Sequence, residues 1–176
     1  MKVICISGRA GAGKDVTGTR LADVLKNKGY KVQIAHYADL LKYILRTFYG
    51  WDGNKDEKGR NLLQKVGEKV RFSYKDFWID FLIDLANILF NDSIDYLIIP
   101  DTRYPNEIER WKELGYQTRH VRVICDRPSK LTFEQQNHPS EISLDGYPYD
   151  EIIRNNGTLD ELTETCKALV ELKWGL

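Results

Sequence analysis

Near its start the chain reads Val3-Ile4-Cys5-Ile6-Ser7-Gly8-Arg9-Ala10-Gly11-Ala12-Gly13-Lys14. The apolar first half predicts a buried strand, and the segment after it has the periodicity of a helix. A glycine-rich stretch between strand and helix, closed by lysine, matches the G-x-x-x-x-G-K pattern of a phosphate-binding loop. The glycines let backbone N–H groups point inward at a phosphate, and the lysine adds a positive charge. The sequence therefore predicts an α/β fold with a phosphate site formed by Gly8, Arg9, Ala10, Gly11, Ala12, Gly13 and Lys14.

The residue after the lysine differs from the general pattern. Asp15 stands where a serine or threonine hydroxyl usually binds Mg²⁺. A carboxylate there can reach the ion through a water molecule, or it can favour the positive end of the following helix. Thr17 is not placed to supply the missing hydroxyl. Asp15 is therefore a candidate metal ligand, and the sequence leaves its direct contact with the ion open.

Short β-branched runs alternate with helical patterns along the rest of the chain, which indicates a parallel sheet with helices on both faces. We expect five strands, at Val3–Ser7, Val32–His36, Tyr96–Pro100, Thr118–Cys125 and Glu151–Arg154. We expect helices at Lys14–Lys28, Ala38–Tyr49, Arg60–Tyr74, Phe77–Phe90, Pro105–Leu114 and Leu159–Lys173. The 176 residues suit a three-layer α/β fold in a single domain, residues 1–176.

Two segments lack periodicity, residues 50–59 and 126–149, and we expect both to be mobile loops. A long loop in a compact domain most often closes over an active site, so residues 126–149 are the predicted lid. Arg127 and Lys130 would form a basic arm over a triphosphate, which makes Arg127 a candidate catalytic residue. His138-Pro139-Ser140-Glu141 indicates an acidic hinge.

A second carboxylate and three arginines extend the predicted site. The apolar strand Tyr96–Pro100 ends in Asp101, at the sheet edge where the phosphate loop also lies. Asp101 would hold Mg²⁺ or its water, or orient an acceptor phosphate. Arg103 has the forked guanidinium that clamps phosphates. Arg60 and Arg71 are separated by about three helical turns and would point to one side.

The three histidines are scattered along the chain. His36 lies at a strand end and His120 within a strand, where packing roles are expected. Phosphoryl transfer to a phosphate is limited by charge and positioning, and it needs no covalent nucleophile or catalytic base. The sequence is therefore compatible with that reaction.

Composition narrows the partners and the compartment. Lysine plus arginine (26) balances aspartate plus glutamate (26), so we expect neither nucleic acid nor a membrane as a partner. Cys5, Cys125 and Cys166 are widely spaced and odd in number, which indicates a reducing compartment without disulfides or a zinc site. No secretory signal precedes the first strand, so a cytoplasmic location is expected.

Together these features resemble the phage-type deoxynucleoside monophosphate kinases, part of the wider nucleoside monophosphate kinase group. The likeness spans nearly the whole chain and depends on the order of short motifs. These are Ser7-Gly8, Gly13-Lys14-Asp15, Ala38-Asp39-Leu40-Leu41-Lys42, Leu63-Gln64, Gly67-Glu68, Arg71, Phe77-Trp78, Ile99-Pro100-Asp101-Thr102-Arg103, His138-Pro139-Ser140-Glu141 and Asn155-Asn156-Gly157-Thr158-Leu159-Asp160-Glu161-Leu162. An aspartate after the loop lysine is usual in this family, so Asp15 supports the resemblance.

The resemblance implies the P-loop NTPase fold, ATP and Mg²⁺ as cofactors, a lid, and a helical acceptor-binding region at about residues 38–90. It implies Lys14, Asp101, Arg103 and Arg127 as catalytic residues and Asp15 and Asp101 at the metal. The residues facing the monophosphate would be Asp39, Lys42, Arg60, Gln64, Arg71, Trp78 and Arg103. Asn156 and Gly157 would lie near the adenine of ATP.

Several alternatives stay open. The region from Arg60 to Trp78, which would select the base, matches the family more loosely. Animal-type phosphomevalonate kinases share the Gly-Lys-Asp loop and the Asp-Thr-Arg strand end, and dephospho-coenzyme A kinase is a third candidate. An ATP-binding regulator without transfer activity is a different class, against which Lys42, Arg60 and Arg103 argue. The preferred base and sugar and a possible homodimer are also left open.

Overall fold

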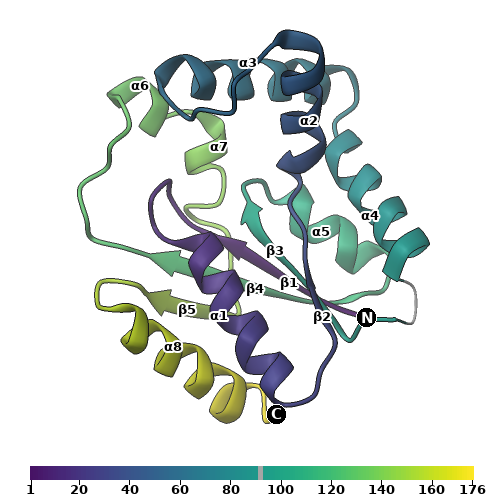
Figure 1. Cartoon of the computed structure of the whole chain (residues 1–176), viewed down its shortest axis with the longest axis vertical. Coiled ribbons are helices and arrows are strands. Elements are labelled where there is room, and N and C mark those ends of the chain that lie inside the picture. The colour runs from purple at the N-terminus through teal and green to yellow at the C-terminus, as the bar shows by residue number, and fades with distance from the viewer. Residues whose placement is uncertain (91–92) are drawn as a thin grey trace.

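A five-stranded parallel sheet forms the centre of the computed structural model, which describes residues 1–90 and 93–176 (Figure 1). The strands stand in the order β2-β3-β1-β4-β5, and every neighbouring pair is parallel. They are β1 (Lys2–Ser7), β2 (Val32–Ile34), β3 (Tyr96–Thr102), β4 (Gln117–Ile124) and β5 (Glu151–Arg154). The predicted α/β fold with a five-stranded parallel sheet is confirmed.

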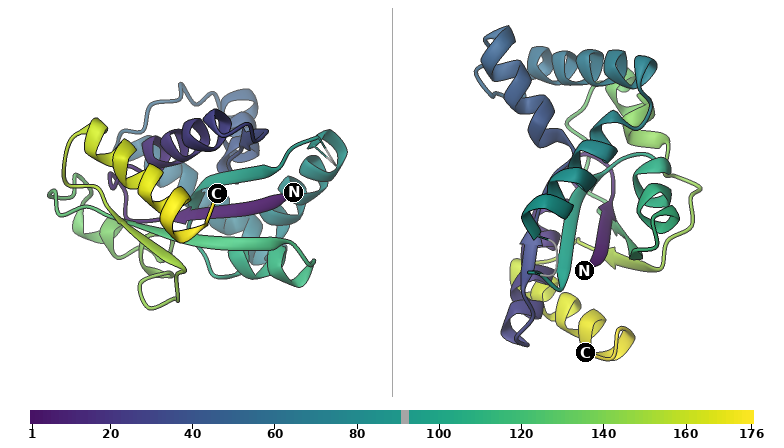
Figure 2. Two further views of the ribbon diagram at one scale, coloured as in Figure 1. Left: turned by 90° about the horizontal axis from the view of Figure 1, so that it is seen from below. Right: turned by 90° about the vertical axis from the view of Figure 1, so that its right-hand side faces the viewer.

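Helices cover both faces of the sheet because side chains along each strand alternate between the faces. On β1, Ile4 and Ile6 pack on one face, whereas Val3 and Cys5 pack on the other. The first face is covered by α1 (Lys14–Asn27) and α8 (Leu159–Ala168), the second by α4 (Phe77–Phe90) and α5 (Asn106–Glu113). The left view of Figure 2 shows α1 and α8 together on one side. These layers fix the sheet edge that carries the site.

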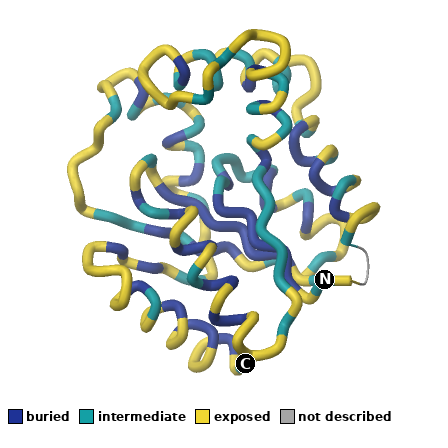
Figure 3. The backbone as a smooth tube through the Cα atoms, viewed as in Figure 1, coloured by how far each residue is buried: buried dark blue, intermediate teal, exposed yellow. Residues whose placement is uncertain are grey.

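Two further helices stand above the carboxyl end of β3, α2 (Ala38–Tyr49) and α3 (Glu57–Ser73) (Figure 1). Together with α4 they form a separate small core, centred on Leu41, Leu45 and Trp78. Their outer sides are exposed, in contrast to the buried central strands (Figure 3). Helix α3 begins earlier than predicted because Asp56 caps it, accepting a hydrogen bond from the N–H of Gly59 at 2.8 Å.

The segment 126–149 contains two short helices, α6 (Phe133–Gln136) and α7 (Pro139–Ile142), so the prediction of a loop without regular structure is wrong for these residues. Helix α6 begins with a capping box between Thr132 and Gln135. Helix α7 has Pro139 in its first turn, where proline is favoured. Both helices are too short for a periodic apolar pattern, and only these caps indicate them.

Several element ends differ from the prediction by a few residues, among them those of β2 and α8. Strand β2 ends at Ile34, before His36, because the chain turns toward the sheet edge, where Asp101 binds the N–H groups of Tyr37 and Ala38. Helix α8 ends at Ala168 and continues as a π-helical turn, Leu169–Lys173. Within the described ranges, no helix combines the length and the apolarity that crossing a membrane requires.

Candidate active site

The phosphate loop joins β1 to α1 and is shaped by close packing against neighbouring strands. A Cβ atom on Gly8 would lie 2.5 Å from the carbonyl oxygen of Val123, so β4 leaves no room for a side chain. Gly13 has φ 93°, and a Cβ there would lie 2.2 Å from the side-chain nitrogen of Asn155. That amide donates a hydrogen bond to the carbonyl of Ala12 at 2.9 Å. The glycines are therefore required by packing as well as by the loop conformation.

Lys14 is folded back along this loop. Its Nζ donates to the carbonyl oxygens of Gly8 at 2.8 Å and Arg9 at 3.2 Å. Burial and the neighbouring Arg103 lower the pKa of Lys14 to about 7. A bound polyanion would favour the charged ammonium, so phosphate binding and the charge of Lys14 are coupled.

Asp101 holds the start of α2 against the end of β3. Its two carboxylate oxygens accept hydrogen bonds from the N–H groups of Tyr37 and Ala38, each at 3.0 Å. N–H groups at a helix N-terminus have no partner within the helix, so Asp101 supplies one. The helix dipole also favours its negative charge at this end. Asp101 thus fixes where α2 and its Lys42 lie relative to the phosphate loop.

A cavity of about 300 Å³ lies between the phosphate loop and the helices α2, α3 and α4. The predicted residues that line it are Ala10, Gly11, Lys14, Asp15, Lys42, Arg60, Gln64, Arg71, Trp78, Asp101 and Arg103. Trp78 is only 3% exposed, and its indole N–H donates to the carbonyl of Gly67 at 3.3 Å. Cationic side chains therefore line the walls of the cavity, and Trp78 belongs to its apolar floor.

His36 lies in this cavity, so the expected packing role is wrong. Its Nε2 lies 3.1 Å from Asp15 and its Nδ1 3.3 Å from Asp39. These two carboxylates raise the pKa of His36 to about 9. An imidazolium therefore links the phosphate-loop helix to α2, and Lys42 also pairs with Asp39, at 2.8 Å. The signal missed in the sequence is the place of His36 after a parallel strand, the same signal that identified Asp101.

Glu107 is a buried carboxyl group that sequence reasoning missed. It is 1% exposed and accepts hydrogen bonds from the N–H groups of Arg103 at 2.6 Å and Tyr104 at 3.2 Å. Arg71 lies 3.4 Å from its other oxygen and also stacks over the Tyr104 ring at 4.4 Å. Glu107 therefore holds two arginines of the cavity in place, Arg103 through its backbone N–H and Arg71 through its guanidinium.

The pKa of Glu107 predicts a pH dependence of stability. Burial raises the pKa of Glu107 from the usual 4.5 to about 7, and the negative charge of nearby Asp101 adds to the rise. Arg71 and the backbone N–H donors act in the opposite direction and lower this pKa. The folded protein keeps a proton that the unfolded chain releases. This contribution to the free energy of unfolding is present below pH 4.5, decreases as the pH rises, and is lost above pH 7.

We expect the difference in free energy of unfolding between the wild type and Glu107→Gln to change by about 3 kcal/mol across this window, at about 1.4 kcal/mol per pKa unit. Urea denaturation at several pH values measures the difference. Glu113→Gln, on the exposed end of α5, is the matched control. A difference that does not vary with pH would show that the pKa of Glu107 is not raised.

Several predicted site residues lie outside the cavity. Arg127 donates to the thiol of Cys125 at 2.9 Å and to the carbonyl of Asn155 at 3.3 Å, so the structure does not bring it to Lys14 and Arg103. Asn156 binds Asp126, and Gly157 follows in the same exposed turn. Asp39 does not line the cavity itself, but it contacts His36 and Lys42, which do. The remaining predicted residues belong to the phosphate loop without lining the cavity; they are Gly8, Arg9, Ala12 and Gly13.

Asp15 and Asp101 are the predicted metal ligands. Among the residues that the structure describes, no three histidine, cysteine, aspartate or glutamate side chains are gathered closely enough to hold a metal ion. Mg²⁺ commonly uses one or two carboxylates together with phosphate oxygens and waters. The two carboxylates face the same cavity, so the residues fit an ion that arrives with a nucleotide.

Comparison with known proteins gives a family. The family model of deoxynucleotide monophosphate kinase matches residues 51–166. The deoxynucleotide monophosphate kinase of phage T4 is 31% identical over 111 residues, which is 61% of this chain and 43% of the phage enzyme. The chain thus matches less than half the length of that relative. Phosphomevalonate kinase of Drosophila melanogaster is 26% identical over 176 residues, 92% of each chain.

Solved structures support the fold. A mutant APS kinase of Mycobacterium tuberculosis superposes with a TM-score of 0.52 at 14% identity, covering 97% of this chain and 96% of that one. At this identity the likeness concerns the arrangement of the sheet and helices, and the site must be argued from its own residues.

Proposed function

The chain belongs to the deoxynucleotide monophosphate kinase family, and on this premise we propose that it transfers the γ-phosphate of ATP to a deoxynucleoside monophosphate. The observation that carries the proposal is the cavity, in which the phosphate loop faces Lys42, Arg60, Arg71 and Arg103. One anionic ligand would occupy the loop, and a second would occupy the arginines opposite it. Two polyanions brought together in this way are the substrates of phosphoryl transfer.

On the donor side, the backbone N–H groups of the loop and the N-terminus of α1 would bind the terminal phosphates of ATP. Lys14 would lie against the β- and γ-phosphates and neutralise the charge that moves during transfer. Asn156 and Gly157 would border the adenine. Arg127, which now contacts Asn155, would reach the triphosphate only after a movement of residues 126–149.

On the acceptor side, Lys42, Arg60, Arg71 and Arg103 would hold the monophosphate, and Gln64 would bind a polar group of the base or sugar. Trp78 and Leu63 would contact the apolar faces of the nucleoside. Asp39 would act through Lys42, whose ammonium it orients at 2.8 Å. Asp101 would act by holding α2 in place.

In the transfer step, an oxygen of the acceptor monophosphate forms a bond to the γ-phosphorus as the bond to the β–γ bridging oxygen breaks. The products are a nucleoside diphosphate and ADP. The attacking oxygen is already an anion, so no side chain has to remove a proton. Asp15 and Asp101 would hold Mg²⁺, whose charge would offset that of the triphosphate.

A reducing compartment such as the cytoplasm suits this chain. Cys5 and Cys166 are buried, and none of the described cysteines forms a disulfide. Their burial raises the pKa of both thiols to about 12, which keeps them unreactive.

A second candidate acceptor is phosphomevalonate. It is favoured by the match to the Drosophila enzyme over 92% of both chains, since the phage match covers a smaller part. The same cations would bind the phosphate of phosphomevalonate. The apolar floor of the cavity would then contact the rest of that molecule instead of a nucleoside.

The test is an ATP-consumption assay with Mg²⁺ against dAMP, dGMP, dCMP, dTMP, their ribose counterparts, phosphomevalonate and dephospho-coenzyme A. We expect turnover with at least one deoxynucleotide, in preference to its ribose counterpart. Turnover with phosphomevalonate alone would replace the acceptor and keep the reaction. ATP binding without turnover on any acceptor would contradict the proposal and favour a regulatory protein.

A further inference from the structure

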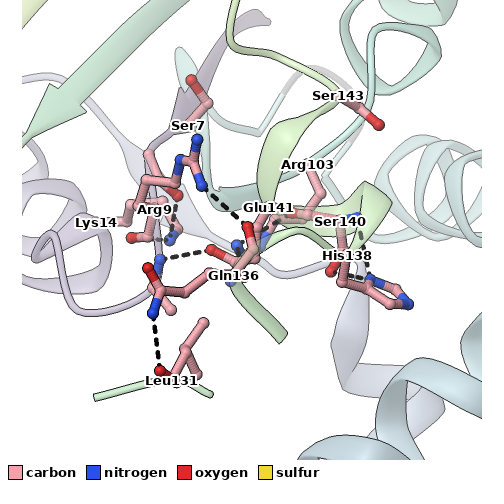
Figure 4. A network of polar contacts seen from close by, with 12 residues as sticks. Ser7, Arg9, Lys14, Arg103, Leu131, Gln136, His138, Ser140, Glu141 and Ser143 are labelled. Carbon is pink, nitrogen blue, oxygen red and sulfur yellow. Dashed lines mark hydrogen bonds and ion pairs between the residues drawn. The ribbon is translucent and has the colours of Figure 1, made fainter. Parts of the chain in front are cut away.

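A carboxylate from α7 occupies the phosphate loop. Oε2 of Glu141 accepts a hydrogen bond from the N–H of Ala10 at 2.7 Å, and Oε1 pairs with the guanidinium of Arg103. Its side chain is only 6% exposed. Figure 4 shows Glu141 between Arg103 and the loop residues Arg9 and Lys14. An anionic group is therefore buried among the donors that the proposed reaction assigns to phosphate.

The contacts of Glu141 are those that a phosphate oxygen would make. A loop N–H and a guanidinium are both strong donors to an anion. The negative charge of Glu141 also raises the pKa of the nearby Lys14, against the larger lowering effect of burial. Arg103 donates from the same nitrogen, Nη1, to the carbonyl of Ser140 as well, at 3.2 Å, so both hydrogen bonds of this nitrogen go to α7. Arg103, one of the cations proposed to bind phosphate, is thus paired with a carboxylate before any ligand binds.

The segment that carries Glu141 is attached on both sides of the cavity. Asp145 pairs with Arg9 of the loop and lies 2.7 Å from Arg122 of β4. On the other side, His138 lies 2.9 Å from Glu68 of α3. These contacts hold α7 over the loop, so a ligand that enters the phosphate site has to displace the Glu141 carboxylate.

We propose that Glu141 is a specificity-determining residue that competes with phosphate ligands for the loop. The inference rests on the proposed function only in that the loop binds phosphate. A carboxylate brings one negative charge and two oxygens, whereas a di- or triphosphate brings several of each. Glu141 therefore excludes weakly charged anions, and it yields to polyphosphates, whose gain in contacts exceeds the loss of its own.

Binding measurements on the full chain test this competition. Isothermal titration calorimetry with a non-hydrolysable ATP analogue and with inorganic pyrophosphate would compare the wild type, Glu141→Gln and Glu141→Ala. We expect both variants to bind both probes more tightly, on the order of tenfold. The gain corresponds to about one charge-assisted hydrogen bond of Glu141, which the ligand no longer has to break. Inorganic phosphate, which the wild type should bind very weakly, should become measurable in both variants.

The matched control is Glu134→Gln, which removes an exposed acid from α6 of the same segment and should leave all affinities unchanged. Thermal unfolding of each variant verifies that it is folded. Unchanged or weaker binding of the probes by the folded Glu141 variants would overturn the inference while leaving the kinase proposal intact. Absence of binding to the ATP analogue in every protein, wild type included, would instead contradict the proposed function.

Discussion

Replacing Lys14 with alanine is expected to lower kcat by about 10²- to 10³-fold, the usual loss when one preorganised group that meets developing charge is removed. Lys14 is 7% exposed and already lies along the phosphate loop, held by the carbonyls of Gly8 and Arg9. The loop N–H groups remain in the variant, so the affinity for ATP should fall much less than kcat. Steady-state kinetics with the best acceptor, together with calorimetry of ATP binding, separates the two effects.

Lys26→Ala is the control for this variant, since Lys26 lies on the same helix, is exposed and does not line the cavity. Its kinetics should match those of the wild type. If Lys14→Ala kept its kcat and lost only affinity for ATP, Lys14 would serve binding alone, and its assignment as a catalytic residue would be wrong.

The second large effect is expected for Arg103→Ala, with kcat/KM for the acceptor falling by about 10³-fold, in the range found for arginines that contact a transferring phosphoryl group. Arg103 is placed by the Glu107 carboxylate, which binds its backbone N–H at 2.6 Å. Arg103→Lys should recover only part of the rate, because an ammonium lacks the planar fork that binds two phosphate oxygens at once. Arg110→Ala on α5, which pairs with Asp80 at 2.9 Å, is the control.

Arg103 also pairs with Glu141, so its removal leaves a buried carboxylate without that partner. The double variant Arg103→Ala/Glu141→Gln separates this indirect effect from a direct one. We expect the double variant to stay as slow as Arg103→Ala. Recovery of the rate would mean that Arg103 acts only by neutralising Glu141, and a direct contact with the phosphates would be excluded.

The layers of the fold could be predicted because each depends on a local pattern. The glycine-rich stretch ending at Lys14 identifies the strand, the loop and the helix together. The bounds of α2, α4 and β5 agree with the prediction, since each is a continuous apolar or amphipathic run. Helices α6 and α7 were missed because four residues are too few for a periodic pattern.

The parallel sheet, the phosphate loop and the family resemblance can be predicted from the sequence alone, because strand and helix periods and the spacing of loop residues are local properties. Which charges meet depends instead on the packing of distant segments. His36 lies between Asp15 and Asp39, Glu107 joins Arg71 to the backbone of Arg103, and Glu141 reaches the loop from a distant segment. These contacts depend on how β2, α5 and α7 converge at one sheet edge, and the energy of a charge depends on its burial and its partners, which no local pattern contains.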